Sequence, residues 1–206
     1  LDPIVSGNTA SGSKVVNLFD APFNYVLGTT EVEGLLVEDF AASSDLTTYE
    51  FTLEQGVEFH GDYGEVTAQD AIYSIRRLLE SDNSRNTYFP LSVLSISHEK
   101  RLVRKDADGN VTDERTVPSS AVDDYPEWET AGVVNGSTQV SQTGPYSFEI
   151  ALDEPFAYAT EVLCYTAFSV VPEGIVGDVT GHAGDMSHVE FSTSNPVGTG
   201  PFVFES

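Results

Sequence analysis

The sequence has little positive charge. Of its 206 residues only nine are Lys or Arg, whereas 33 are Asp or Glu, so the net charge at pH 7 is −24. Such a chain repels phosphate groups, which argues against nucleic acid and anionic membrane surfaces as partners. The acidic residues are spread along the whole chain, and lysine is nearly absent. This pattern favours a surface adapted to high salt, as in a halophile, and a site for a cationic ligand is the alternative.

Cysteine and long hydrophobic runs are scarce as well. The single cysteine, Cys164, allows no intrachain disulfide, and its apolar surroundings EVLCYTAFSVV predict a small buried side chain. No apolar run reaches the roughly 18 residues of a membrane-spanning helix. The chain opens at LDPIVSG without a recognisable secretory leader, as a mature or trimmed chain would. With 12 Phe and nine Tyr, however, it has enough apolar side chains to bury a core.

Two segments alternate between apolar and polar residues, as half-buried strands do. They are TYEFTLEQGVEF, which starts at residue 48, and GPYSFEIALDEP, which starts at residue 144. The residues expected on the buried faces are Tyr49, Phe51 and Leu53 in the first segment and Tyr146, Phe148, Ile150 and Leu152 in the second. We expect these two strands to share one sheet and one core.

Helical periodicity is strongest in VTAQDAIYSIRRLLESDN. Thr67 is a suitable N-cap, and Asp70, three residues later, completes a capping box and suits the positive end of the helix dipole. One apolar stripe follows, and the polar run 81–83 ends the helix. The members of the stripe are Ala71, Ile72, Ile75, Leu78 and Leu79.

The remaining segments give weaker signals. The run Lys14–Phe19 predicts a strand, with the segment DAPFNY as the loop that leaves it. KRLVRKDADGNVTDERTV predicts a hairpin that turns at Asp108-Gly109, within a long polar surface insertion at about 106–140. A helix is expected near Phe156–Leu163, followed by a buried strand that ends at Pro172. The tail NPVGTGPFVFES predicts a short aromatic strand.

Two histidine-containing segments carry candidate catalytic or metal-binding residues. His60 and Asp62 lie in FHGDYG, where Gly61 and Gly64 indicate a tight turn, so a structural role is favoured over general base catalysis. The segment GHAGDMSH contains a second cluster of candidate ligands. Two histidines and one carboxylate can bind Zn²⁺ or Fe²⁺, but no fourth ligand is near, so a polar loop is favoured over a metal site. The alternative function, a metal-dependent hydrolase, would use His60, His182, Asp185 and His188.

The glycines of GTGP do not form a dinucleotide-binding fingerprint, because they lead into a predicted strand rather than a helix. Gly198 and Gly200 instead predict either a hinge-like crossing or a close approach of the backbone to another surface.

Four segments, taken in order, resemble the peptide-type solute-binding proteins of ABC transporters, the family of dipeptide- and oligopeptide-binding proteins. They are LDP at the start, TYEFTLEQGVEFH, VTAQDAIYSIRRLL and NPVGTGPFVFES. In that family the FH turn is structural and no catalysis takes place. Here FHGDYGEVTA departs from the family pattern, because it is rearranged and slightly long. Family members are much longer, so the chain resembles their N-terminal part.

The resemblance implies a type II periplasmic-binding-protein-like fold of the α+β or α/β class. It divides the chain into a first-lobe segment at 1–43, an inserted α+β subdomain at 44–167 and a return to the first lobe at 168–206, with the second lobe absent. It also implies an extracytoplasmic receptor, lipid-anchored in the full-length protein, that passes a peptide or other small solute to ABC permease subunits. Neither an enzymatic activity nor a cofactor is implied.

The resemblance also suggests where this lobe would touch a ligand. The loop after the first predicted strand would contribute Asp20, Phe23 and Tyr25. The GTGP turn would lie at the lobe junction, which adds Gly198, Thr199 and Gly200. Since a missing lobe would leave this face uncovered, exposed apolar residues are expected near Phe19, Phe23 and Tyr25.

Overall fold

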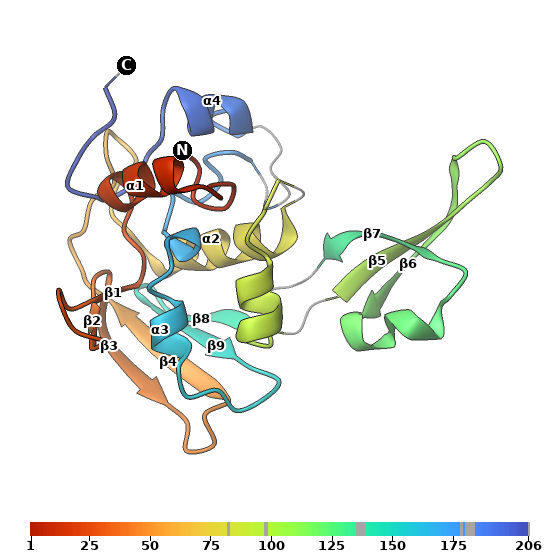
Figure 1. Cartoon of the computed structure of the whole chain (residues 1–206), viewed down its shortest axis with the longest axis horizontal. Coiled ribbons are helices and arrows are strands. Elements are labelled where there is room, and N and C mark those ends of the chain that lie inside the picture. Colours follow the sequence, from red (N-terminus) through yellow and green to blue (C-terminus); the bar gives the residue numbers. More distant parts are fainter. Residues whose placement is uncertain (82, 97–98, 135–138, 178, 180–183, 206) are drawn as a thin grey trace.

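The structure is a computed structural model that describes residues 1–81, 83–96, 99–134, 139–177, 179 and 184–205. Figure 1 shows two unequal parts. We call the larger part the body, which comprises the described residues of 1–96 and 139–205. The smaller part, which stands off from the body, is the extension, residues 99–134.

The body contains a four-stranded antiparallel sheet in the order β3-β4-β9-β8. Its strands are β3 (Val37–Ala42), β4 (Thr48–Leu53), β8 (Val140–Gly144) and β9 (Ser147–Ala151). The two strands predicted from alternation are β4 and β9, and they are paired neighbours at the centre of the sheet, with Phe51 opposite Phe148. The centroids of these two rings are 5.1 Å apart, and both side chains are fully buried. The predicted sheet is thus confirmed.

Helix α2 (Ala68–Glu80) packs against β8 and β9. The predicted capping box forms, because the Thr67 backbone N–H and hydroxyl both donate to Asp70 Oδ2, at 2.8 and 2.7 Å. Asp70 Oδ1 also accepts from the Glu173 backbone N–H at 2.8 Å, which ties the helix to a distant segment. The predicted apolar stripe of α2 is buried along its length. A π-helical turn, η1 (Phe89–Val93), follows.

The N-terminal segment corrects two predictions. Helix α1 (Thr9–Leu18) stands where a strand was predicted over Lys14–Phe19. The Asn8 side chain caps it by accepting from the Ser11 backbone N–H at 2.9 Å, and Val15 and Leu18, three residues apart, are buried. Strand β1 (Phe23–Tyr25) occupies the predicted loop and pairs with β2 (Val32–Gly34).

The C-terminal part confirms one prediction and corrects two. The helix expected near Phe156–Leu163 is present as the short α3 (Ala159–Val162), and the turn η3 (Thr166–Phe168) follows it. Residues 169–172 are buried as expected, but they form no strand, because the Val170 backbone N–H donates to Asp20 O and not to a sheet neighbour. The tail after α4 (His188–Thr193) forms no strand within its described residues.

The extension is a three-stranded antiparallel sheet in the order β6-β5-β7, with a 3₁₀ turn, η2 (Ser119–Asp124). Its strands are β5 (Glu99–Lys105), β6 (Val111–Pro118) and β7 (Glu129–Val134). The predicted hairpin is confirmed, and Gly109 in its turn has the left-handed φ of 84° that favours glycine. The extension differs from the predicted surface insertion because it starts earlier in the chain and has a third strand.

One hydrophobic core unites the ends and the middle of the body, from Ile4 to Val197. Its deepest polar contact is an ion pair between Asp2 and Arg77, whose side chains are 0% and 1% exposed. The Arg77 guanidinium also lies over the Phe191 ring of α4, 5.5 Å from its centroid. The division at 43 and 167 concerns the lobes of a longer protein and stays a proposal.

Candidate functional site

The GTGP turn packs against the end of α1. The Gly200 backbone N–H donates to Leu18 O at 3.1 Å. A Cβ atom at Gly198 would lie 2.3 Å from Leu18 O, and one at Gly200 would lie 2.6 Å from the Leu18 carbonyl carbon. Any side chain would therefore separate the two segments. The close backbone approach predicted from the two glycines is confirmed.

His60 holds the other side of this turn. Its backbone N–H donates to Gly198 O at 2.9 Å, and its Nε2 donates to Gly200 O at 2.8 Å. A carbonyl can only accept, so the proton of the ring lies on Nε2. The structural role predicted for the FH turn is thus confirmed, and it extends to a part of the chain that the local sequence gave no reason to expect.

Asp20 follows α1 directly and faces Thr199 of the same turn. The Thr199 hydroxyl donates to Asp20 Oδ2 at 2.9 Å, and the backbone oxygen of Asp20 accepts from Val170 N–H at 3.0 Å. Burial raises the pKa of the Asp20 carboxyl above its ordinary value, while the bond from Thr199 and the nearby His60 oppose this shift. Two of the predicted ligand contacts, Asp20 and Thr199, are therefore brought together.

Three hollows surround β1. The first, of about 110 Å³, is lined by Asp20, Phe23 and Ser169 among others. The second, of about 210 Å³, shares Phe23 and reaches Phe40, and the third, of about 510 Å³, has Tyr25 on one wall. Ser169 was not predicted, because it is distant in sequence from Asp20 and no local motif marks it. A further hollow of about 570 Å³ lies between α1 and the tail, and none of the predicted ligand contacts lines it.

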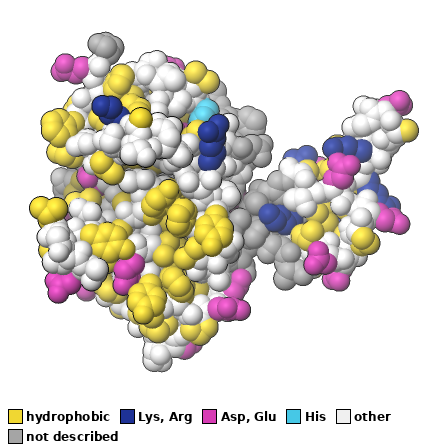
Figure 2. Space-filling model, viewed as in Figure 1, with side chains coloured by type: hydrophobic (Ala, Val, Ile, Leu, Met, Phe, Trp, Pro, Cys, Tyr) yellow, Lys and Arg dark blue, Asp and Glu magenta, His cyan; other side chains and the backbone are white. Residues whose placement is uncertain are grey.

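Apolar side chains gather on the face of the body that Figure 2 presents. The predicted cluster of exposed apolar residues near Phe19, Phe23 and Tyr25 is confirmed. Tyr25 itself is 45% exposed, whereas Phe19 and Phe23 are buried, at 2% and 3% exposed. Phe19 is buried against Phe191 of α4, and Phe23 against Phe40 and Phe51 of the sheet. Other exposed apolar side chains near β1 are Val16, Leu27, Leu35, Phe40 and Tyr158.

The alternative metal site does not assemble within the described residues. His60 binds the GTGP carbonyls, whereas His188 Nδ1 lies 3.2 Å from Asp2 Oδ2, beside Arg77. His182 lies outside the described residues. In the part of the chain that the structure describes, no group of three or more His, Cys, Asp or Glu side chains could hold a metal ion. Nor is any described helix long and apolar enough to cross a membrane.

This arrangement of sheet and helices is similar to one part of the fold of periplasmic solute-binding proteins. The model of the family "bacterial extracellular solute-binding proteins, family 5 Middle" matches residues 31–206, and the chain belongs to this family. No curated protein matches the sequence.

Solved structures agree on the fold. OppA of Haemophilus influenzae, in complex with the peptide RPPGFSPFR, superposes with a TM-score of 0.70 at 16% identity, over 100% of this chain and 33% of that chain. DppA of Helicobacter pylori, in complex with the peptide STSA, gives 0.65 at 20% identity, over 100% and 34%. MoaA of A. tumefaciens R10, in complex with mannopinic acid, gives 0.69 at 18% identity, over 100% and 32%. The chain thus spans about a third of the length of these proteins.

Proposed function

We propose that the chain is the first-lobe part of a receptor that captures a peptide or a similar small solute between two lobes and delivers it to the permease subunits of an ABC importer. The family match over residues 31–206 carries this proposal. The receptor works on the outer side of the cell membrane, held there by a lipid anchor of the full-length protein. The peptide complexes of OppA and DppA support a peptide as the solute, while the mannopinic acid complex of MoaA supports other small solutes.

The face around β1 is the part of this lobe that we propose turns toward the solute. Extended peptides are bound largely through main-chain hydrogen bonds, with pockets for side chains. Asp20 lines the first hollow and Tyr25 lines the third, and Phe23 lines both the first and the second. Gly198, Thr199 and Gly200 form the lobe junction, where Thr199 positions Asp20.

The test uses the two-lobed protein that contains this chain. Native mass spectrometry should find a small solute that copurifies with it, and calorimetry with a mixed peptide pool should give saturable binding. These 206 residues alone should bind the same pool weakly, because solute pockets typically enclose about 70–90% of a ligand and one lobe offers only part of that surface. Submicromolar binding by the 206 residues alone would overturn the assignment of the site to two lobes.

The hydrolase alternative differs from the receptor proposal in the metal content that it predicts. A metal-dependent enzyme would contain stoichiometric zinc or iron after purification. Elemental analysis of the purified protein distinguishes the two functions, since one metal ion per chain would contradict the receptor proposal.

A further inference from the structure

Two polar groups from distant parts of the chain meet in the hollow of about 110 Å³. Asp20 follows α1, and Ser169 follows η3. The hydrogen bond from the Val170 backbone N–H to Asp20 O, at 3.0 Å, joins the two segments. Both residues line the same hollow, so a small group that entered it would meet a carboxylate and a hydroxyl together.

Both polar groups retain unused hydrogen-bonding capacity. Thr199 occupies Asp20 Oδ2, and no hydrogen bond to Asp20 Oδ1 is found in the described part of the chain. Ser169 is only 3% exposed, and its Oγ has no hydrogen-bond partner within the same residues. Buried polar groups in native proteins are rarely left unpaired, and each exception requires an explanation. A bound group that donates several hydrogen bonds would satisfy both.

The electrostatics of the three hollows favour a positively charged group. Their linings contain four carboxylates, and none of their lining residues is Lys, Arg or His. The carboxylates are Asp20, Glu38, Asp39 and Glu161. A cation that leaves water for such a site keeps its charge paired.

The volume and the rim of the first hollow restrict which positively charged group can enter it. Its volume of about 110 Å³ suits the end of a side chain and not a whole solute. The rim includes Val16 and Leu35, which are 53% and 43% exposed and could pack against a methylene stem. A primary ammonium group on an alkyl stem fits both features, because it supplies three hydrogen-bond donors and a run of methylene groups.

We infer that the hollow between Asp20 and Ser169 is a subsite for a primary ammonium group on an alkyl stem, such as the lysine side chain of a peptide. This inference rests on the proposed function and names the class of solute that the receptor takes. Solutes that carry a lysine-like amine are selected, and solutes that place a carboxylate here are rejected by the surrounding negative charge.

The subsite can be tested on this chain directly. N-acetyl-lysine-N-methylamide is titrated into the 206-residue protein at low ionic strength, and backbone amide NMR signals are followed. The matched probes are the norleucine and glutamate analogues, which have a neutral and an anionic end. The lysine probe should give saturable shifts at Asp20, Ala21 and Ser169 with a dissociation constant of about 1–10 mM, and the other two probes should not. Equal shifts with the norleucine probe would overturn the inference.

Two variants locate the effect. Asp20→Asn keeps an acceptor for Thr199 but removes the charge, and it should weaken binding of the lysine probe by about tenfold. Ser169→Ala removes the unpaired hydroxyl and should weaken binding by about two- to threefold. Asp108→Asn removes one negative charge at the tip of the extension, where Asn also suits the turn, and binding should not change. Unchanged affinity in both Asp20→Asn and Ser169→Ala would overturn the inference.

The test of the subsite and the test of the proposed function can fail separately. If the two-lobed protein binds a solute but this chain does not distinguish the lysine probe from the norleucine probe, only the subsite is wrong. If this chain binds the lysine probe at Asp20 but the two-lobed protein captures no solute, the subsite stands and the receptor proposal fails.

Discussion

The body and the extension are stabilised by different forces. In the body, one apolar core runs from Ile4 to Val197 and encloses the ion pair of Asp2 and Arg77. In the extension, the buried apolar side chains among the described residues are Leu102, Val103 and Val117, and none of them belongs to the core of the body. Because hydrophobic stabilisation grows with buried area, the extension can add little to the stability of the whole chain.

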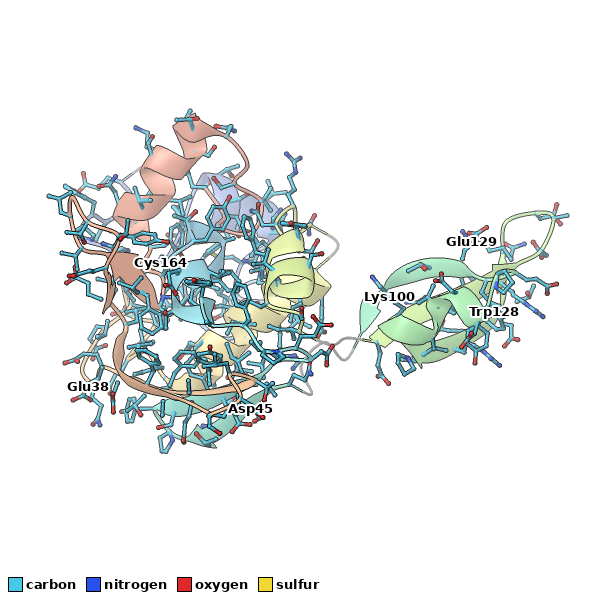
Figure 3. The ribbon with its side chains drawn as sticks, turned by 60° about the horizontal axis from the view of Figure 1, so that its bottom comes forward. Glu38, Asp45, Lys100, Trp128, Glu129 and Cys164 are labelled. Atoms are coloured by element: carbon cyan, nitrogen blue, oxygen red, sulfur yellow. The ribbon has the colours of Figure 1, made fainter. Side chains whose placement is uncertain are left out.

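Surface contacts replace a large core in the extension. Two guanidinium groups lie over the Trp128 ring, that of Arg104 at 4.8 Å and that of Arg115 at 4.7 Å from its centroid. Exposed ion pairs add to this contact, among them Arg104–Glu127 at 2.8 Å and Lys105–Glu129 at 2.6 Å. Figure 3 shows Trp128 and Glu129 on the extension, far from Cys164 of the body. The two parts should therefore unfold separately.

The largest expected contrast comes from one truncation in each core. Phe148→Ala removes a fully buried ring at the centre of the body's sheet and should cost about 3–5 kcal/mol of unfolding free energy. Leu102→Ala should unfold the extension alone. Trp128 is the single tryptophan of the chain, so its fluorescence reports on the extension. Hydrogen exchange of β4, which pairs with β9 at Phe148, reports on the body.

We expect neither substitution to affect the other part. Hydrogen exchange in β4 should be unchanged in Leu102→Ala, even where the Trp128 signal is that of an unfolded segment. If Leu102→Ala lowered protection in β4 as much as Phe148→Ala does, the two parts would fold as one unit, and the contrast would be lost.

The second contrast concerns ion pairs. Arg77→Met leaves the carboxylate of Asp2 buried without its partner, which should cost about 3–5 kcal/mol. Arg101→Met breaks the pair with Glu114 in the extension, whose side chains are 43% and 51% exposed, and should cost less than about 1 kcal/mol. Urea unfolding of both variants measures the difference. Similar losses in the two variants would mean that burial does not separate the two parts.

The same buried pair limits the stability of the body in acid. Burial alone would raise the pKa of the Asp2 carboxyl, but the neighbouring His188 and Arg77 together outweigh burial and hold this pKa below its ordinary value. A carboxyl whose pKa is lower in the folded state stabilises that state fully above its unfolded pKa, near 3.9, and this contribution is lost as the pH falls toward the folded pKa. Urea midpoints should therefore fall below about pH 4, and the fall should be smaller in Asp2→Asn.

The sequence predicted what regular periodicity determines. The strict alternation in β4 and β9 and the capped apolar stripe of α2 were sufficient for these elements. Helix α1 was missed because Val15 and Val16 suggested a strand, whereas the cap at Asn8 and the spacing of Val15 and Leu18 decide the structure.

The site was predicted less well, because it is built from segments far apart in the chain. The family resemblance led to Asp20, and the two glycines indicated a close approach. The position of Ser169, however, depends on the hydrogen bond from Val170 to Asp20, and the role of His60 depends on carbonyls of the tail. Such contacts are set by tertiary packing, for which a single sequence carries no local signal.

A smaller effect is expected from Gly200→Ala, which tests the packing of the GTGP turn. The added Cβ would lie 2.7 Å from Asn17 O, so the turn must move away from α1, at a cost of about 1–3 kcal/mol. Gly12→Ala is the matched control, because no atom lies within 4 Å of its Cβ and alanine favours the helix. Thermal unfolding should show a loss for the first and a small gain for the second. A neutral Gly200→Ala would contradict the close approach.

The smallest effect, and the sharpest division between the two parts, is expected from salt. The extension holds five of the nine basic residues but only nine of the 33 acidic ones, so most of the negative charge lies on the rest of the chain. In the body, Glu50 of β4 lies directly opposite Glu149 of β9, and like charges in this position repel.

Molar KCl should screen this repulsion and raise the midpoint of thermal unfolding of the body. The exposed ion pairs of the extension weaken with salt, so the midpoint reported by Trp128 should stay constant or fall. Melting curves from about 0.05 to about 2 M KCl, a range over which the Debye length shortens severalfold, measure both signals. If the body gains no stability over this range, an acidic surface adapted to high salt is excluded, and the carboxylates around β1 are better explained by a cationic solute.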